Sequence, residues 1–109
     1  MLNLTPHAIN INGKIYEPSG VVARVIMEEK VVNTLNGITV ISRFATGVEG
    51  IPEEGEFLVS SMVLDALDDV YHMHAFAPDT GNTAIRDNQG RIVAVTRLVT
   101  KLSIYRIYY

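Results

Sequence analysis

Two Asn-Gly pairs constrain the fold of this chain more than any other feature. Asn12-Gly13 separates Ile9–Ile11 from Lys14–Tyr16, and Asn36-Gly37 separates residues 31–35 from residues 38–45. A two-residue type I′ turn requires positive φ at both central residues, and Asn-Gly adopts this conformation at low cost. The flanking runs are rich in β-branched residues, which favour strands. The sequence therefore predicts two antiparallel β-hairpins.

The turn also fixes the register of the second hairpin, because a two-residue loop sets which residues lie opposite each other. The predicted cross-strand pairs are Leu35 with Ile38, Asn33 with Val40, and Val31 with Ser42. A third hairpin is expected around residues 88–90, joining residues 83–86 to residues 91–95. The C-terminal residues 102–109 have strand propensity and no breaker, which predicts a final strand.

Only residues 61–70 show apolar residues at helical spacing, and Ser60 or Ser61 is a suitable N-cap. A chain of 109 residues is long enough for one core and too short for two, so residues 1–109 are expected to form a single domain. The predicted fold is mainly β, with at least half of the residues in strands. We expect a compact barrel or sandwich of antiparallel hairpins with one short helix.

The composition excludes several classes of function. The chain has no Cys, which removes disulfides, thiolate metal ligands and a Cys nucleophile, and favours a reducing compartment. Its start shows no charged leader, and no apolar run approaches the length of a membrane helix, so we expect a cytoplasmic protein without membrane contact. The net charge of -3 argues against nucleic-acid binding.

Charge is distributed unevenly along the chain. Residues 49–69 contain seven acids and no base, whereas residues 86–109 contain five bases and one acid. Such polarity fits an anionic ligand at the basic end, the docking of one copy on another, or simply two solvated surfaces. The tail also carries Tyr105, Tyr108 and Tyr109, which predicts that it completes the sheet or forms a homo-oligomer interface.

Three arginines lie within or beside apolar strands, where alternate positions turn inward: Arg24, Arg43 and Arg86. A partly buried guanidinium requires an anion, either a carboxylate such as Glu49 or Asp79 or the phosphate of a ligand. The polar residues expected to orient such a ligand are Thr5, His7, Ser60, Asp79 and Thr80. Two of these have structural alternatives, since Ser60 fits a helix cap and Asp79 fits an Asx turn.

Other chemistries are less well supported. His72 and His74 have a metal-ligand spacing that His7 could complete, but no carboxylate follows at a recognisable distance, and we expect no metal or cofactor. A hydrolase using His7 with Asp79 is a third interpretation, yet no nucleophile, base and orienting group can be assembled from local spacing. We therefore expect the protein not to be an enzyme.

Several motifs occur in order along the chain: residues 2–7 (LNLTPH), 18–20 (PSG), 47–52 (GVEGIP), 78–80 (PDT) and 84–92 (AIRDNQGRI). Together they resemble a family of small uncharacterised proteins of tailed phages, prophages and some bacteria, over residues 2 to about 98. The resemblance implies no reaction. It implies a phage or mobile-element origin, a setting in which small cytoplasmic proteins often act as accessory or counter-defence factors.

The arginines and the resemblance together predict a non-enzymatic protein that sequesters a small anionic, nucleotide-like molecule and acts as a counter-defence factor. The alternative is a protein-interaction or structural module without a small ligand, which would bind its partner through open strand edges.

Overall fold

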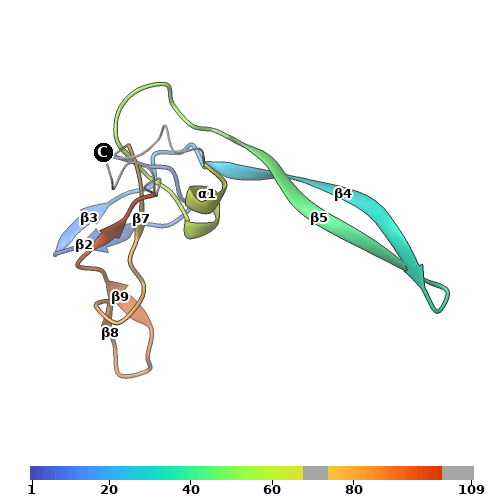
Figure 1. Ribbon diagram of the computed structural model, residues 1–109. Helices are drawn as coiled ribbons and strands as arrows, with labels where there is room; N and C mark the ends of the chain where they lie inside the picture. Colours follow the sequence, from blue (N-terminus) through green and yellow to red (C-terminus); the bar gives the residue numbers. More distant parts are fainter. Residues whose placement is uncertain (68–73, 102–109) are drawn as a thin grey trace, which may run out of the picture.

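The computed structural model describes residues 1–67 and 74–101 (Figure 1). The fold is mainly β with one short helix, as the sequence predicts, and strands account for 49%, just under the predicted half. The elements are β1 (Leu2–Asn3), β2 (Ile9–Ile11), β3 (Lys14–Tyr16), β4 (Arg24–Leu35), β5 (Ile38–Glu49), β6 (Phe57–Leu58), α1 (Ser61–Ala66), β7 (Ala75–Pro78), β8 (Ile85–Arg86), β9 (Ile92–Ala94) and β10 (Leu98–Val99).

The body of the molecule is built on a four-stranded sheet in the order β1-β6-β7-β10. β6 pairs in parallel with both β1 and β7, and β10 closes the sheet by antiparallel pairing with β7. Parallel neighbours require a crossover, and the segment that contains α1 connects β6 to β7. The hairpin signals in the sequence did not predict these parallel pairs, because they report only turns between neighbouring strands.

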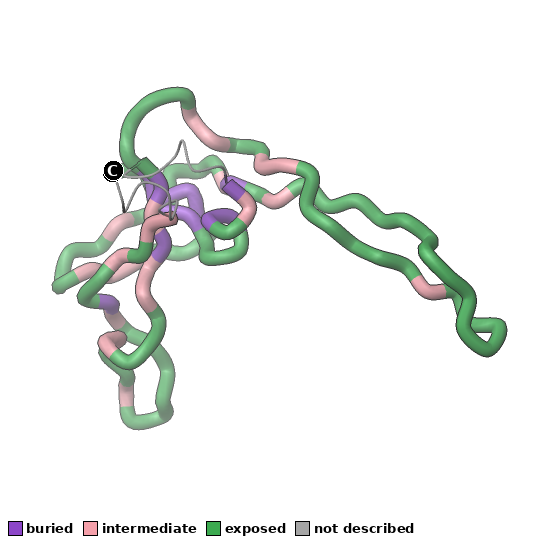
Figure 2. Tube along the Cα trace, in the orientation of Figure 1, coloured by how far each residue is buried: buried purple, intermediate pink, exposed green. Residues whose placement is uncertain are grey.

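The core lies between this sheet and the helix. Phe57 and Leu58 are at most 1% exposed, and Phe57 belongs to a buried cluster with residues of α1 and of β7. Figure 2 shows that the buried residues gather in the body. Ser60 caps the helix, its Oγ accepting a hydrogen bond from the Val63 N–H at 3.3 Å. The helix is shorter than predicted because Leu67 has an extended backbone; residues 68–70 of the predicted helix and the tail 102–109 lie outside the described residues.

All three predicted hairpins form. Asn12 and Asn36 have φ of 52° and 49°, as their type I′ turns require, and β8 and β9 form the third hairpin, with a register shift. The first and third hairpins lie beside the body. β4, β5 and their turn, here called the arm, extend away from it as an isolated two-stranded ribbon (Figure 1).

The arm gives the molecule its extended shape. The radius of gyration is 17.1 Å, whereas a compact chain of this length has a value of about 13 Å. The described strands form no closed barrel. The described residues thus form several sheets, mostly antiparallel hairpins, with a projecting arm and without the closed barrel that was one of the two expected architectures.

The register of the arm differs from the prediction at one point. Leu35 lies opposite Ile38 and Asn33 opposite Val40, as predicted, but Val31 pairs with Ile41 rather than with Ser42. The reason is a β-bulge at Val32, which inserts one extra residue into β4. Turn chemistry fixes the pairs next to the turn and carries no information about a bulge further along.

Candidate functional site

The motif at residues 2–7 is held together by the buried side chain of Asn3, which is 2% exposed. Its amide nitrogen donates to the carbonyls of His7 (2.7 Å) and Tyr16 (2.9 Å). Its oxygen accepts from the N–H and the hydroxyl of Thr5, at 3.0 and 2.7 Å. All hydrogen-bonding groups of the Asn3 amide are thereby satisfied in the interior. Thr5, predicted as a ligand group, is itself buried and belongs to this internal network.

Asp79 forms the Asx turn that was its structural alternative. Its Oδ1 accepts from the Gly81 N–H at 3.0 Å, and its Oδ2 lies 2.6 Å from Nη2 of Arg97. The Gly81 N–H, and then the Arg97 guanidinium, hold the pKa of the Asp79 carboxyl below its ordinary value of 3.8. The carboxylate anion therefore has fixed partners within the chain. It is a brace between the end of β7 and β10, and its charge repels rather than attracts an anionic ligand.

Arg86 is fixed by backbone carbonyls. Its Nη1 donates to the Gly90 carbonyl at 2.8 Å and its Nη2 to the Thr80 carbonyl at 3.2 Å. The bond to Gly90 lies within the β8–β9 hairpin, and the bond to Thr80 connects this hairpin to the loop after β7. A guanidinium has five N–H donors, so donors remain for a ligand.

A surface hollow of about 340 Å³, here called the groove, lies beside Arg86. It is lined by His7, Ala8, Ile9, Asn10, Pro78, Thr80, Ile92, Val93, Ala94 and Val95. The Thr80 carbonyl accepts from Arg86, and Ile92 lies opposite Arg86 in the hairpin. The groove thus brings together His7 and Thr80, with Arg86 adjacent, although these residues are far apart in sequence.

The remaining predicted site residues lie elsewhere. Arg24 and Arg43 are exposed residues of the arm rather than of the groove wall. Arg24 lies opposite Glu49 in the ribbon, and Nε of Arg43 donates to Glu29 at 2.7 Å. The structural ion-pair alternative therefore describes Arg43, whose partner is Glu29. The Ser60 hydroxyl is occupied by the helix cap.

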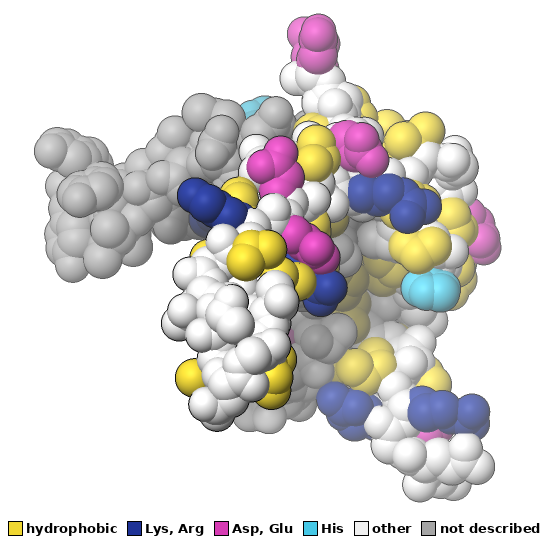
Figure 3. All heavy atoms as spheres, turned by 90° about the vertical axis from the view of Figure 1, so that its right-hand side faces the viewer, with side chains coloured by type: hydrophobic (Ala, Val, Ile, Leu, Met, Phe, Trp, Pro, Cys, Tyr) yellow, Lys and Arg dark blue, Asp and Glu magenta, His cyan; other side chains and the backbone are white. Residues whose placement is uncertain are grey.

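The basic residues near the groove differ in how they are neutralised. Arg91 pairs with Asp87 at 3.1 Å and Arg97 pairs with Asp79. Arg86 has no carboxylate partner in residues 1–67 and 74–101. In Figure 3 basic side chains stand out at the lower end of the molecule, where Figure 1 places the β8–β9 hairpin.

Two residues considered for metal binding and for hydrolysis, His74 and Asp79, have other partners in the described part of the chain. No group of three potential metal ligands occurs there. Nδ1 of His74 lies 3.3 Å from the Gly55 carbonyl, and His72 lies outside the described residues. Both carboxylate oxygens of Asp79 have partners other than His7, so a His7–Asp79 pair is not formed. No described helix is long and apolar enough to cross a membrane.

Sequence reasoning missed the walls of the groove and the partner of Asp79. Ile9 and Ile92–Ala94 come from two different hairpins, and their meeting depends on the hydrogen bonds that join Asn10 and Asn12 to Val95. Arg97 belongs to the basic C-terminal stretch, which was the available signal. Its pairing with Asp79 follows from the β7–β10 register, which the sequence does not display.

No protein-family model, curated protein or solved structure matches this chain.

Proposed function

We propose that the protein is a non-enzymatic binding protein that captures a small anionic, nucleotide-like molecule at the groove. Capture lowers the free concentration of the ligand in proportion to the amount of protein. In a cell under phage infection, sequestration of a signalling nucleotide would serve as counter-defence. Arg86 is the proposed anion partner, with Thr80 and His7 as polar groups on the groove wall.

The observation that carries the proposal is the state of Arg86. Its neighbours Arg91 and Arg97 are neutralised by carboxylates, whereas Arg86 keeps its charge and is held in place by two carbonyls. A positioned guanidinium with free donors binds phosphate strongly because it loses little conformational freedom on binding.

The groove supports the nucleotide class rather than a simple inorganic anion. Its walls include Ile9, Pro78 and Ile92, which offer apolar surface to a planar base. Its volume of about 340 Å³ falls within the range of small-molecule sites, about 300–1,000 Å³. An apolar wall beside a fixed cation matches a ligand with an aromatic part and a phosphate.

The test is whether the purified protein carries or binds a nucleotide. Full-length protein is heat-denatured and the released supernatant is analysed by mass spectrometry, and in parallel nucleoside monophosphates and dinucleotides are screened by thermal shift. A ligand at 100 times its Kd adds about 2.7 kcal/mol to the free energy of unfolding, which gives a clear shift. Recovery of the unchanged ligand after incubation supports capture. Absence of both released nucleotide and thermal shift overturns the proposal, and appearance of product replaces capture with catalysis.

The alternative function is a protein-interaction module without a small ligand. The arm favours it, because its two strands are paired only with each other and carry exposed apolar side chains. This alternative predicts that nucleotides neither accompany nor stabilise the protein, while a partner protein raises its melting temperature.

A further inference from the structure

The arm is the most exposed part of the described molecule. Eight large apolar side chains between Ile26 and Phe44 expose 40–66% of their surface, and Figure 2 shows the arm exposed along nearly its whole length. No backbone hydrogen bond joins residues 26–45 to the described part of the body. An isolated two-stranded ribbon is only marginally stable in water. Its twelve-residue strands therefore require a contact that a single described chain does not provide.

The outer half of the arm also lacks the usual protection of open strand edges. Residues 31–41 contain no charged residue and no proline. Proteins normally blunt exposed edges with charges, proline or short strands, because uncovered edges recruit other chains. In Figure 3, which views the molecule from the side to which the arm points, the near part of the arm shows white and yellow atoms, that is, backbone, uncharged polar and hydrophobic groups. This composition is typical of a surface that contacts another chain in the functional protein.

We propose that the arm is covered by the arm of a second copy of this chain. In a two-fold symmetric dimer the two arms run antiparallel, so that the tip of each arm reaches the root of the other. This inference concerns the arm alone and does not depend on the proposed ligand site.

Charge favours a second copy as the occupant. Residues 24–49 contain three bases (Arg24, Lys30, Arg43) and three acids (Glu28, Glu29, Glu49), so the arm is neutral although the chain carries -3. Two identical charged surfaces repel each other, whereas two neutral arms do not. The net negative charge of the chain therefore lies outside residues 24–49.

The exposed area points to the same occupant. The eight side chains lie on both faces of the ribbon and expose roughly 800 Å² together. Each partner of a stable complex buries about this much surface, so a partner arm that covers both faces would bury enough. A second copy is also present whenever the chain is made. The uncharged outer half of the arm, residues 31–41, is a template for aggregation while it is uncovered, so a partner of equal abundance protects it.

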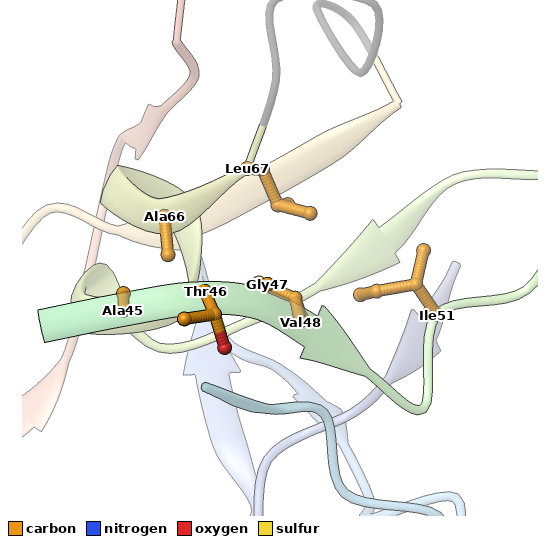
Figure 4. A pocket seen from close by; sticks show the side chains of 7 residues that line it. All are labelled: Ala45, Thr46, Gly47, Val48, Ile51, Ala66 and Leu67. Carbon is orange, nitrogen blue, oxygen red and sulfur yellow. The ribbon is translucent and has the colours of Figure 1, made fainter. Parts of the chain in front are cut away.

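The root of the arm offers a receptor for the partner's tip. A cleft of about 360 Å³, here called the root cleft, lies between β5 and α1 (Figure 4). Its lining is entirely uncharged: Ala45, Thr46, Gly47, Val48, Ile51, Ala66 and Leu67. At the tip, Leu35 and Ile38 are 59% and 66% exposed. Antiparallel arms of equal length place these two side chains beside the root cleft of the other copy.

The first experiment measures the oligomeric state of the full-length chain by sedimentation velocity over a concentration series. We expect a dimer. The variant combines Leu35→Glu with Ile38→Lys. Residues 35 and 38 are cross-strand partners, so the new opposite charges can pair and the hairpin is retained. We expect at least a 100-fold weaker dimer, because both charges would be desolvated at the interface. Ile15→Lys adds a charge at an apolar residue of the β2–β3 hairpin that is 50% exposed, and it leaves the dimer unchanged.

A second experiment tests the antiparallel geometry without disturbing the apolar contacts. The chain has no native Cys, so Thr39→Cys near the tip and Thr46→Cys at the root each introduce a unique thiol. Mixing the two variants under mild oxidation yields a disulfide between one tip and the other root. Gln89→Cys, at the tip of the β8–β9 hairpin, serves as the control and does not cross-link to either.

A monomer at about 20 μM overturns the proposal, since a contact of this size holds at that concentration. A dimer that survives Leu35→Glu with Ile38→Lys overturns it as well, as does cross-linking of tip to tip in place of tip to root. Monomeric protein that sediments with phosphatidylcholine vesicles through its tip identifies a lipid surface and also overturns it. Should the double variant fail to fold, the cross-link pattern decides.

Discussion

Arg86 is the residue on which the proposed ligand site depends. Replacing it by Ala removes a positioned cation, and we expect ligand binding to weaken by about 1.5–3 kcal/mol, the scale of a hydrogen bond to a charged group. Isothermal titration with the ligand identified in the heat-release experiment measures the change. Arg91→Ala is the matched control, because Asp87 already neutralises Arg91.

A structural role of Arg86 is separated from a binding role by a second variant. Arg86→Ala also removes the bonds to Gly90 and Thr80, so its melting temperature is measured alongside. Arg86→Lys keeps the charge and loses the planar fork, and we expect it to recover part of the affinity. Wild-type affinity in a folded Arg86→Ala protein would remove Arg86 from the site.

Asp79 predicts a dependence of stability on pH. Its folded-state pKa lies below its ordinary value, so its ionised form is favoured by folding. The resulting stabilisation is present above the unfolded pKa, near 3.8, and is lost as the pH falls through the lower folded pKa. In Asp79→Asn we therefore expect lower stability at neutral pH and a flatter decline below about pH 4.

Thermal unfolding across this acidic range measures the effect. Glu54→Gln, in the exposed loop between β5 and β6, changes the net charge by the same amount and serves as the control. A parallel decline in Asp79→Asn and the wild-type protein would show that the Asp79–Arg97 brace contributes nothing to stability.

Among the elements, the root of the arm depends on Gly50. It has φ of 82°, and a Cβ atom there would lie 2.8 Å from the Val22 carbonyl oxygen and 3.3 Å from the Ala23 Cα. Gly55 also has positive φ, 104°, but a Cβ atom there meets nothing within 4 Å. The pair separates backbone strain from close packing.

We expect Gly55→Ala to lower the free energy of unfolding by about 1 kcal/mol, the cost of positive φ for a residue with a Cβ atom. Gly50→Ala carries the same strain and must also displace the backbone near Val22. We therefore expect it to lower the free energy of unfolding by at least about 1 kcal/mol more than Gly55→Ala does. Urea unfolding compares the two. Equal losses would show that the segment around Val22 yields without cost.

For the molecule as a whole, salt distinguishes two possible modes of self-association. An interface of uncharged arm tips is insensitive to screening, so we expect the dimer constant to change by less than threefold between about 50 and 500 mM NaCl. The docking of basic residues 86–109 on acidic residues 49–69, which is one interpretation of the charge pattern, would instead weaken strongly at the higher salt concentration.

Sedimentation at the two salt concentrations measures the difference. A chain ending at Lys101 extends the test, because an arm-mediated dimer survives removal of residues 102–109. If the dimer dissociates in high salt or after this truncation, the interface lies at the tail and not at the arm.

The sequence by itself determined what depends on neighbouring residues. Asn-Gly chemistry predicted both type I′ turns. The cap at Ser60 or Ser61 and the Asx turn at Asp79 were structural alternatives to the predicted ligand roles, and the structure shows the cap at Ser60 and the Asx turn. Each of these features is decided by contacts within a few positions, where residue type and backbone conformation are directly coupled. His7, Thr80 and Arg86 were proposed for one site, and the fold places them at or beside one groove.

Only the tertiary structure decided the rest. The parallel pairing of β1 with β6 joins residues more than fifty positions apart, and it follows from competition for burial around Phe57 rather than from any local signal. The pairing of β7 with β10 brings Arg97 to Asp79, while Arg86 has no carboxylate partner among the described residues. Arg24 and Arg43 were predicted to face inward because the alternation of apolar residues distinguishes the two faces of a strand. Whether either face is covered depends on what packs against it, and the arm extends beyond the body.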